Sequence, residues 1–133
     1  MSLTDLLMDK QDSRDRARRT NGVAVGVVTD NQDPEGLGRV RVRFPWLAED
    51  AESTWSRIAT FMAGPERGAV FLPEVDDEVL VAFEQGDINF PYVIGALWSA
   101  QDTPPEANAD GANNIRLIRS RSGHELVFND DDE

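Results

Sequence analysis

The residues best suited to chemistry form an alternating basic run, in which single apolar residues separate Arg39, Arg41 and Arg43. Alternate side chains of a β-strand point to the same face, so this spacing places three guanidinium groups in a row. Trp46 and Trp55 follow soon after in the sequence. A row of cations beside aromatic rings is typical of a groove for single-stranded nucleic acid. The alternative interpretation is that the arginines pair with carboxylates on a neighbouring strand, subunit or partner protein.

A second candidate for chemistry is the acidic run Asp76, Asp77 and Glu78. A glycoside hydrolase needs two carboxyl groups that approach the substrate bond from different sides. Three consecutive residues in a tight turn beside a strand do not converge on a substrate in this way. We therefore expect no catalytic site, and the chain is predicted not to be an enzyme.

Metal chemistry has two weak candidates. His124 is the only histidine, and it follows Gly123 in a predicted hairpin, while Glu125 is expected on the opposite face of the strand. The acids at 130–133 could attract calcium, but they lack the spaced oxygen ligands and the glycine of a calcium loop. We interpret them as a solvated chain end and expect neither a metal nor a cofactor.

Overall charge argues against the nucleic-acid interpretation. The chain has 133 residues, with 25 acidic residues against 13 Lys and Arg, and its net charge is −12. Such a chain is repelled by phosphates unless a local basic patch overrides the total. No nucleic acid is therefore expected as a partner. There are no cysteines, and no stretch approaches the roughly 20 apolar residues of a transmembrane helix.

The elements that must position these residues are short strands with Gly and Pro turns between them. The central one follows the acidic run: Val79, Val81 and Phe83 point one way, while Leu80 and Ala82 point the other. A strand that is apolar on both faces is usually central in its sheet. Other strands are expected from Gly22, over 39–44, 54–62 and 68–72, and over 91–98, with turns at 31–36 and 64–68. The predicted core is Val23, Val25, Val40, Val42, Phe44, Val79, Val81, Phe83, Val93 and Leu97.

Composition divides the chain into four parts. Residues 1–20 form a charged arm, flexible or docked to a partner, in which Thr4 caps a short apolar start that includes Leu6 and Leu7. Residues 21–99 form a small β-barrel, and residues 100–113 form a linker rich in Pro, Asp and Asn. Residues 114–133 contain two further strands around Ser122 and Gly123.

The last two strands pose a physical problem, because an isolated hairpin cannot bury its own apolar side chains. Its apolar residues are Ile115, Leu117, Leu126 and Phe128. They could fold back on the barrel, or they could meet the same segments of other copies of the chain.

Four segments, in the same order along most of the chain, resemble the phage baseplate assembly protein V / VgrG family. The first is Asp33-Pro34-Glu35-Gly36-Leu37-Gly38 with the arginine strand and Pro45-Trp46. The others are Ala63-Gly64-Pro65-Glu66-Arg67-Gly68 with Phe71-Leu72-Pro73-Glu74-Val75, Gly86-Asp87 with Pro91-Tyr92-Val93-Ile94-Gly95, and Ile118-Arg119-Ser120-Arg121-Ser122-Gly123-His124-Glu125. The segment 88–90 departs from the family pattern.

The resemblance implies an all-β chain: an oligonucleotide/oligosaccharide-binding (OB) type barrel followed by a short β-hairpin or β-helix shaft segment, intertwined in a homotrimer. Such a protein is a structural part of the central spike that a phage tail, type VI secretion system or related particle drives through an envelope. Ile115, Leu117, Leu126 and Phe128 would then lie between chains. In longer members the shaft continues further and a hub domain precedes the barrel, so this chain resembles the short members whose hub is a separate protein.

Partners follow from the same resemblance. They are two further copies of the chain, hub and baseplate proteins, the tail tube, a tip protein or effector at the C-terminal end, and the target envelope. Leu6, Leu7, Arg39, Arg41 and Arg43 are the candidates for docking to hub or baseplate proteins. The chain is expected in the cytoplasm during assembly and then in a virion tail or injection particle. A single-strand-binding OB module is the alternative function.

Overall fold

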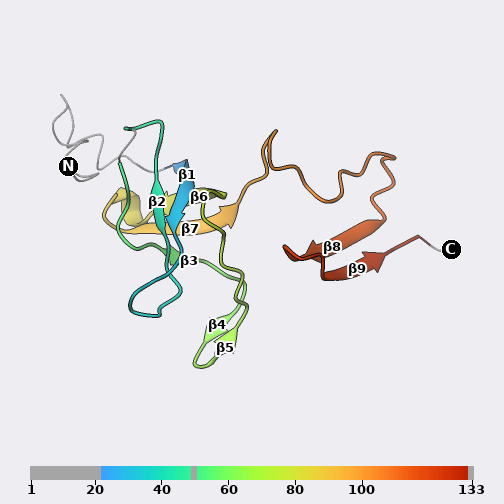
Figure 1. The fold of residues 1–133 in the computed structure, drawn as a ribbon, viewed down its shortest axis with the longest axis horizontal. Helices are drawn as coiled ribbons and strands as arrows, with labels where there is room; N and C mark the ends of the chain where they lie inside the picture. The colour runs from blue at the N-terminus through green and yellow to red at the C-terminus, as the bar shows by residue number, and fades with distance from the viewer. Residues whose placement is uncertain (1–21, 49–50, 132–133) are drawn as a thin grey trace. The chain divides into compact units, whose positions relative to one another are not determined.

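The computed structural model describes residues 22–48 and 51–131, and the chain divides into two units, Met1–Leu97 and Trp98–Glu133. Leu6 and Leu7 lie outside the described residues. Over those residues, no helix is long and apolar enough to cross a membrane. The first unit contains one five-stranded sheet and a small hairpin, and the second contains another hairpin (Figure 1).

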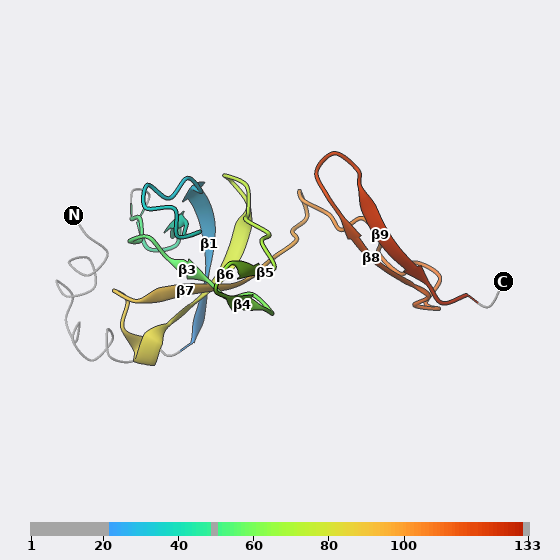
Figure 2. The ribbon, with the colours of Figure 1, turned by 90° about the horizontal axis from the view of Figure 1, so that it is seen from below.

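The sheet of the first unit has the strand order β2-β1-β6-β7-β3 (Figures 1 and 2). All of its neighbours are antiparallel except β3 and β7, which run parallel. β6 lies in the middle, which confirms the central position predicted from its two apolar faces. The strands are β1 (Val23–Asp30), β2 (Arg41–Arg43), β3 (Arg57–Ile58), β6 (Glu78–Phe83) and β7 (Pro91–Ala96), and a 3₁₀ turn spans Glu84–Gly86.

Residues 51–56 join the two edges of this sheet. They run antiparallel to β2 through the bridges Val40↔Ser56 and Arg43↔Glu52, and β3 follows directly after Ser56. Val40 and Ser56 exchange both backbone hydrogen bonds, at 3.0 and 2.7 Å. Ser53 and Ser56 are buried in this connection, where each hydroxyl finds a hydrogen-bond partner. The sheet therefore curls into a small barrel with both edges paired, which removes the open edges that favour aggregation.

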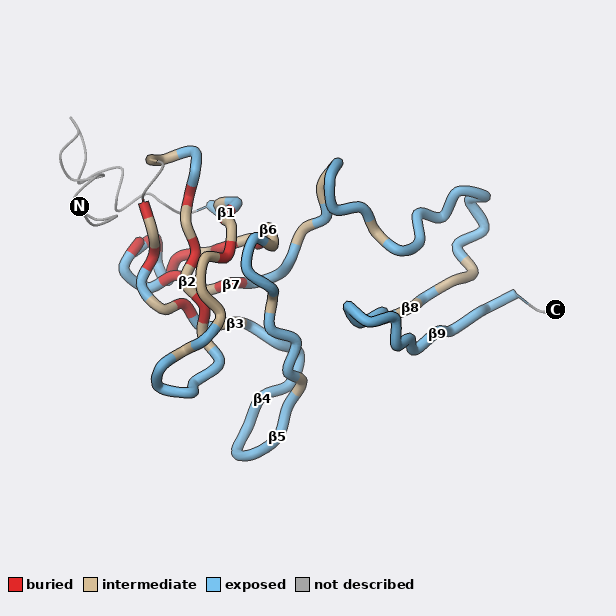
Figure 3. Tube along the Cα trace, in the orientation of Figure 1, coloured by how far each residue is buried: buried red, intermediate tan, exposed pale blue. Residues whose placement is uncertain are grey.

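The core fills the inside of this curl, and seven of the ten predicted core residues are buried (Figure 3). Phe44 is its largest fully buried side chain, with the Phe83 ring 6.1 Å from it between centroids. Val28, Ala51 and Ile88 complete the core and were not predicted. The buried residues are Val28, Val40, Val42, Phe44, Ala51, Val79, Val81, Phe83, Ile88 and Val93.

The predicted orientation of β1 was wrong. Val23 and Val25 are 56% and 40% exposed, whereas Val28 is fully buried. Gly26 also faces the core, where a Cβ would lie 2.2 Å from Val42 Cγ1. Both faces of β1 carry apolar residues, so alternation alone could not tell the inner face from the outer one. Leu97, also predicted for the core, is only half-buried beyond the end of β7.

Two expected strands are also different in the structure. Of the expected strand over 54–62 only Arg57–Ile58 forms a strand, with Ser56 bridged to Val40 beside it, and Phe61 is 87% exposed. Residues 69–72 form no strand. Instead β4 (Ala63–Gly64) pairs with β5 (Arg67–Gly68) around the expected turn. Gly68 has a φ of +144°, and a Cβ there would approach Met62 O to 2.5 Å, so glycine is required for this hairpin to close.

The second unit contains the predicted terminal hairpin. β8 (Ile115–Arg119) pairs antiparallel with β9 (Glu125–Asn129), in continuous register from Ile115↔Asn129 to Arg119↔Glu125. Arg116 pairs with Asp130, and Arg119 with Glu125. All of β9 is exposed, as is most of β8 (Figure 3).

The two strand glycines give a matched test of the barrel core. We expect Gly26→Ala to lower the free energy of unfolding by about 1–3 kcal/mol, because the new methyl overlaps buried Val42 and nearby backbone. Gly95→Ala meets nothing within 4 Å and should change stability by less than about 0.5 kcal/mol. Urea unfolding followed by tryptophan fluorescence measures both. Equal effects of the two substitutions would contradict the orientation of β1.

Candidate functional site

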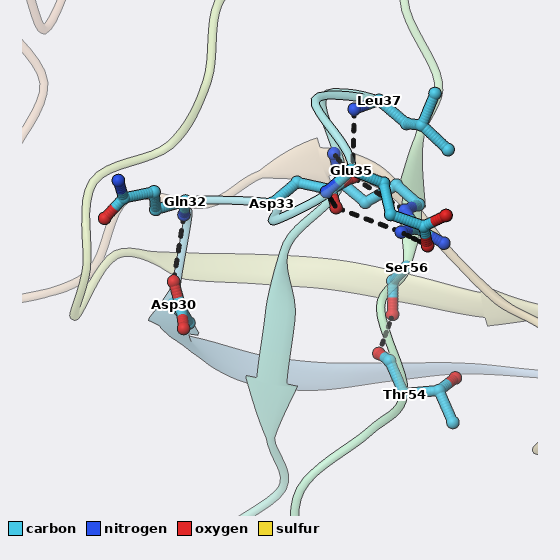
Figure 4. A network of polar contacts seen from close by, with 8 residues as sticks. Asp30, Gln32, Asp33, Glu35, Leu37, Thr54 and Ser56 are labelled. Atoms are coloured by element: carbon cyan, nitrogen blue, oxygen red, sulfur yellow. Dashed lines mark hydrogen bonds and ion pairs between the residues drawn. The ribbon is translucent and has the colours of Figure 1, made fainter.

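The loop between β1 and β2 is organised around one carboxylate, that of Asp33 (Figure 4). It accepts hydrogen bonds from the backbone N–H groups of Glu35, Leu37 and Arg39, and from Arg39 Nε at 2.7 Å and Nη2 at 3.0 Å. Arg39 Nη2 also donates to Glu35 at 2.9 Å. The hydrogen bond from the Arg39 side chain holds the pKa of Asp33 well below its ordinary value, although burial acts in the opposite direction.

Arg41 is held by a second acid. Its guanidinium is 2.6 Å from Glu52 Oε1 and lies 5.9 Å from the centre of the Trp55 ring. The other carboxylate oxygen of Glu52 accepts a hydrogen bond from Thr29 on β1. Glu52 therefore ties β1 to β2 and to the segment that closes the barrel.

These contacts bear on the two interpretations of the arginine row. The partners of Arg39 and Arg41 are carboxylates of the same chain, so a phosphate would have to compete with them. Trp46 Nε1 donates to the carbonyl of Val25 at 3.0 Å, which fixes this indole against the edge of β1. The arrangement favours internal pairing of Arg39 and Arg41 over a nucleic-acid groove.

The other chemical candidates are separate from one another. Asp76, with a φ of +79°, and Asp77 lie in the turn before β6, and Asp77 accepts a hydrogen bond from the backbone of Glu74. Glu78 begins β6. His124 is exposed beside the turn of the terminal hairpin, where its backbone N–H donates to Ser120. Within residues 22–48 and 51–131, no three His, Asp or Glu side chains form a group that could hold a metal ion.

An apolar surface on the first unit was not anticipated. Phe61, Val70 and Phe71 are 87%, 80% and 68% exposed, and they flank the β4–β5 hairpin. Val70 and Phe71, together with Leu37, Met62 and Leu72, line a groove of about 280 Å³. The sequence predicts a strand over 68–72, and alternation of apolar residues does not distinguish such a strand from an exposed apolar segment.

The terminal hairpin is apolar on both faces. The register places Ile115 and Leu117 on one face with Val127, and Leu126 and Phe128 on the other. Ile118, which was not predicted as part of this set, lies directly opposite Leu126. The four predicted residues are therefore brought together in one hairpin but divided between its two faces.

Comparison with known proteins places the first unit in a family. The family model of the type VI secretion system/phage-baseplate injector OB domain matches residues 24–98. These residues contain all the strands of the barrel except Val23, the first residue of β1.

Several spike proteins are similar to the chain. The type VI secretion system spike protein VgrG3 of Vibrio cholerae is 33% identical over 100 residues, which are 69% of this chain and 10% of VgrG3. VgrG4b and VgrG5 of Pseudomonas aeruginosa are 35% and 33% identical over 68% and 80% of this chain. The aligned parts are 14% and 16% of these two proteins. The chain thus spans a small fraction of the length of the relatives it matches.

The Asp33–Arg39 pair gives a pH-dependent prediction. Asp33→Asn should lower stability at pH 7, because an amide cannot accept the ionic hydrogen bonds of Arg39. The folded-state pKa of Asp33 is depressed, so its stabilisation is complete above the ordinary Asp pKa of about 3.9 and is lost as the pH falls below it. The difference in urea midpoint between wild type and variant should therefore become smaller when the pH is lowered from about 5 to about 3, that is, from above to below the ordinary Asp pKa.

Arg39→Gln is the matched control for this pair. It should show a similar pH dependence, and the double variant should be little worse than either single one. A stability gap that is the same at both pH values would contradict the assigned role of Asp33.

Proposed function

Because the chain belongs to the injector OB domain family of type VI secretion systems and phage baseplates, we propose that it forms the barrel and first shaft segment of a trimeric, membrane-piercing spike. The observation that carries the proposal is the terminal hairpin, which has exposed apolar side chains on both faces, Val127 beside half-buried Ile115 and Leu117 on one, and Ile118, Leu126 and Phe128 on the other. Spike proteins at 33–35% identity support the assignment.

A homotrimer covers both faces of the hairpin. In a ring of three copies each hairpin has two neighbours, one on either side. One neighbour can cover Ile115, Leu117 and Val127, and the other can cover Leu126 and Phe128. Burying a large apolar side chain contributes roughly 1.5–3 kcal/mol, so these residues together could offset the loss of freedom on association.

The proposed mechanism is mechanical rather than catalytic. The work of contraction is done elsewhere in the machine, and the spike must transmit force without bending or separating. Intertwined strands supply this stiffness, because no chain can unpair without breaking contacts to two others. The names of the spike relatives support a structural role for the barrel. An actin cross-linking toxin, VgrG1 of Vibrio cholerae, matches over 7% of its own length.

The apolar groove beside β4 and β5 is the barrel surface that we assign to the neighbouring barrel of the same trimer. Val70 and Phe71 are 80% and 68% exposed along it, and Phe61, next to the lining residue Met62, is 87% exposed. Hub and baseplate proteins would meet the barrel elsewhere, with Arg43 as a docking candidate. A tip protein or effector would follow the shaft at the C-terminal end.

Charge placed on either face of the hairpin should abolish the trimer. We expect the wild-type chain to have three times its mass of 14.8 kDa in light scattering after size exclusion. Leu117→Asp and Phe128→Asp, on opposite faces, should each shift the protein to monomer, because a buried unpaired carboxylate costs several kcal/mol.

Gln101→Asp is the matched control, since it adds the same charge in an exposed position away from both strands. It should leave the trimer intact. If the wild type is a monomer at tens of micromolar concentration, or if only one face responds to charge, the proposed arrangement is wrong.

A further inference from the structure

The first unit has an outer sheet face that is apolar and is separate from the groove at β4 and β5. Cross-strand pairing aligns Val23 with Ala82 and Tyr92 in one row, and Val25 with Leu80 and Gly95 in the next. Paired residues share a face of the sheet, and the intervening residues Ala24, Val81 and Val93 point into the core. We call these six residues, Val23, Val25, Leu80, Ala82, Tyr92 and Gly95, the outer face.

This outer face has room for an additional element. Val23 and Val25 are about half exposed, and a Cβ built on Gly95 meets nothing within 4 Å. Glycine at the end of the second row therefore leaves the sheet surface bare beside Leu80. Trp46, fixed by its bond to the Val25 carbonyl, adds a large exposed ring at the edge of β1. A β-sheet with one apolar face uncovered normally packs a helix or a second sheet on it.

We propose that this face is covered by the N-terminal arm of the same chain, through Leu3, Leu6 and Leu7. Since Thr4 is the predicted N-cap, Leu6 and Leu7 lie in the first turn of a short helix, and Leu3 just before the cap can pack against Met8 as a hydrophobic staple. Isolated helices this short are marginal in water, so a stable one needs a surface to pack on. The outer face offers such a surface, and the chain enters it at Val23, directly after the arm.

The arm is long enough for this contact. Fourteen residues separate Met8 from Val23, and an extended chain spans about 3.3–3.6 Å per residue. Neighbouring strands are about 4.8 Å apart, so crossing from β1 to β7 needs only a fraction of that length. A tether of this length also keeps the local concentration of the arm high.

The overall charges of the arm and of the rest of the chain are opposite, which favours contact between them. The first 20 residues contain five of the 13 Lys and Arg residues and four acids, whereas the remainder contains eight basic and 21 acidic residues. The arm is thus the one net basic part of an acidic chain. Val23, where it joins the sheet, pairs with Ala82, two residues from Glu84. A second copy or a hub protein on this face would be an alternative occupant, which the following tests distinguish.

Limited chymotrypsin digestion tests whether the arm is docked, because Leu3, Leu6 and Leu7 are themselves cleavage sites that docking would cover. Docking should slow cleavage there by about tenfold relative to a released arm, as expected for a population shift of that size. Leu7→Asp should release the arm and restore fast cleavage. Gly95→Gln, on the outer face, should also release the arm, because the new side chain occupies the uncovered position without changing the charge. Ser13→Asp, which adds the same charge in the tether beyond Met8, should be cleaved at the wild-type rate.

A cysteine pair tests which chain supplies the arm, since the protein has no cysteine of its own. In the full chain, oxidised Leu7→Cys/Leu80→Cys should form a disulfide within one chain. The control pair Leu7→Cys/Leu37→Cys, with Leu37 exposed in a loop, should form about tenfold less, because a docked arm favours one partner.

The outcomes divide clearly. Slow wild-type cleavage together with a disulfide within one chain supports the proposal. Covalent dimers on a non-reducing gel would assign the face to another copy and overturn it. Equal disulfide yields at both positions, or wild-type cleavage as fast as in Leu7→Asp, would mean that the arm is free of the face and would also overturn it.

Discussion

A two-stranded β-hairpin has no interior, and this constraint governs the second unit of the chain. Each strand has only one neighbour, so side chains on both faces depend on other surfaces for burial. Here Ile118, Leu126 and Phe128 occupy one face, while Leu117 and Val127 occupy the other. A polar outer face would allow the hairpin to lie flat on a single partner. Two apolar faces can be covered by a partner on each side, as in the proposed ring of three identical chains.

The barrel differs from the hairpin, because its sheet is closed and encloses a core of its own. Residues 51–56 pair with β2 and lead into β3, so the strands share one core and both edges are hydrogen-bonded. Glu52 reinforces the closure by binding Arg41 and Thr29 together. Asp33 fixes the loop before β2 in the same manner. Arg39 and Arg41, which look like part of a ligand-binding row in the sequence, thus stabilise the barrel.

Some of this architecture follows from the sequence and some does not. The central position of β6 could be predicted, because a run that is apolar on both faces needs cover on both sides. The orientation of β1 could not, since Val23 and Val28 are equally apolar and only the volume of Val42 and Phe44 beside Gly26 decides between the faces. The exposed segment around Phe71 has the composition of a buried strand, but it forms no strand in the structure.

The hairpin could also be predicted only in part from the sequence. Its existence could be predicted from two apolar runs around Ser122 and Gly123, and family resemblance indicated that other chains cover it. The division of its residues between two faces depends on which residues pair, and the register is set by the turn. Ile118 was therefore missed, although it faces Leu126. Residues 24–98 match the injector OB domain family, which supports the barrel but does not reach the hairpin.

Hydrogen exchange of the β8 and β9 backbone amides in the full chain tests the central claim most directly. An uncovered hairpin is marginally stable and opens freely, so its amides exchange at nearly the rate of an unfolded peptide. If copies of the chain cover both faces, the amides of Leu117, Ile118 and Val127 should be strongly protected, and protection should decrease on dilution. Fast exchange at these positions, unchanged by protein concentration, would contradict the account.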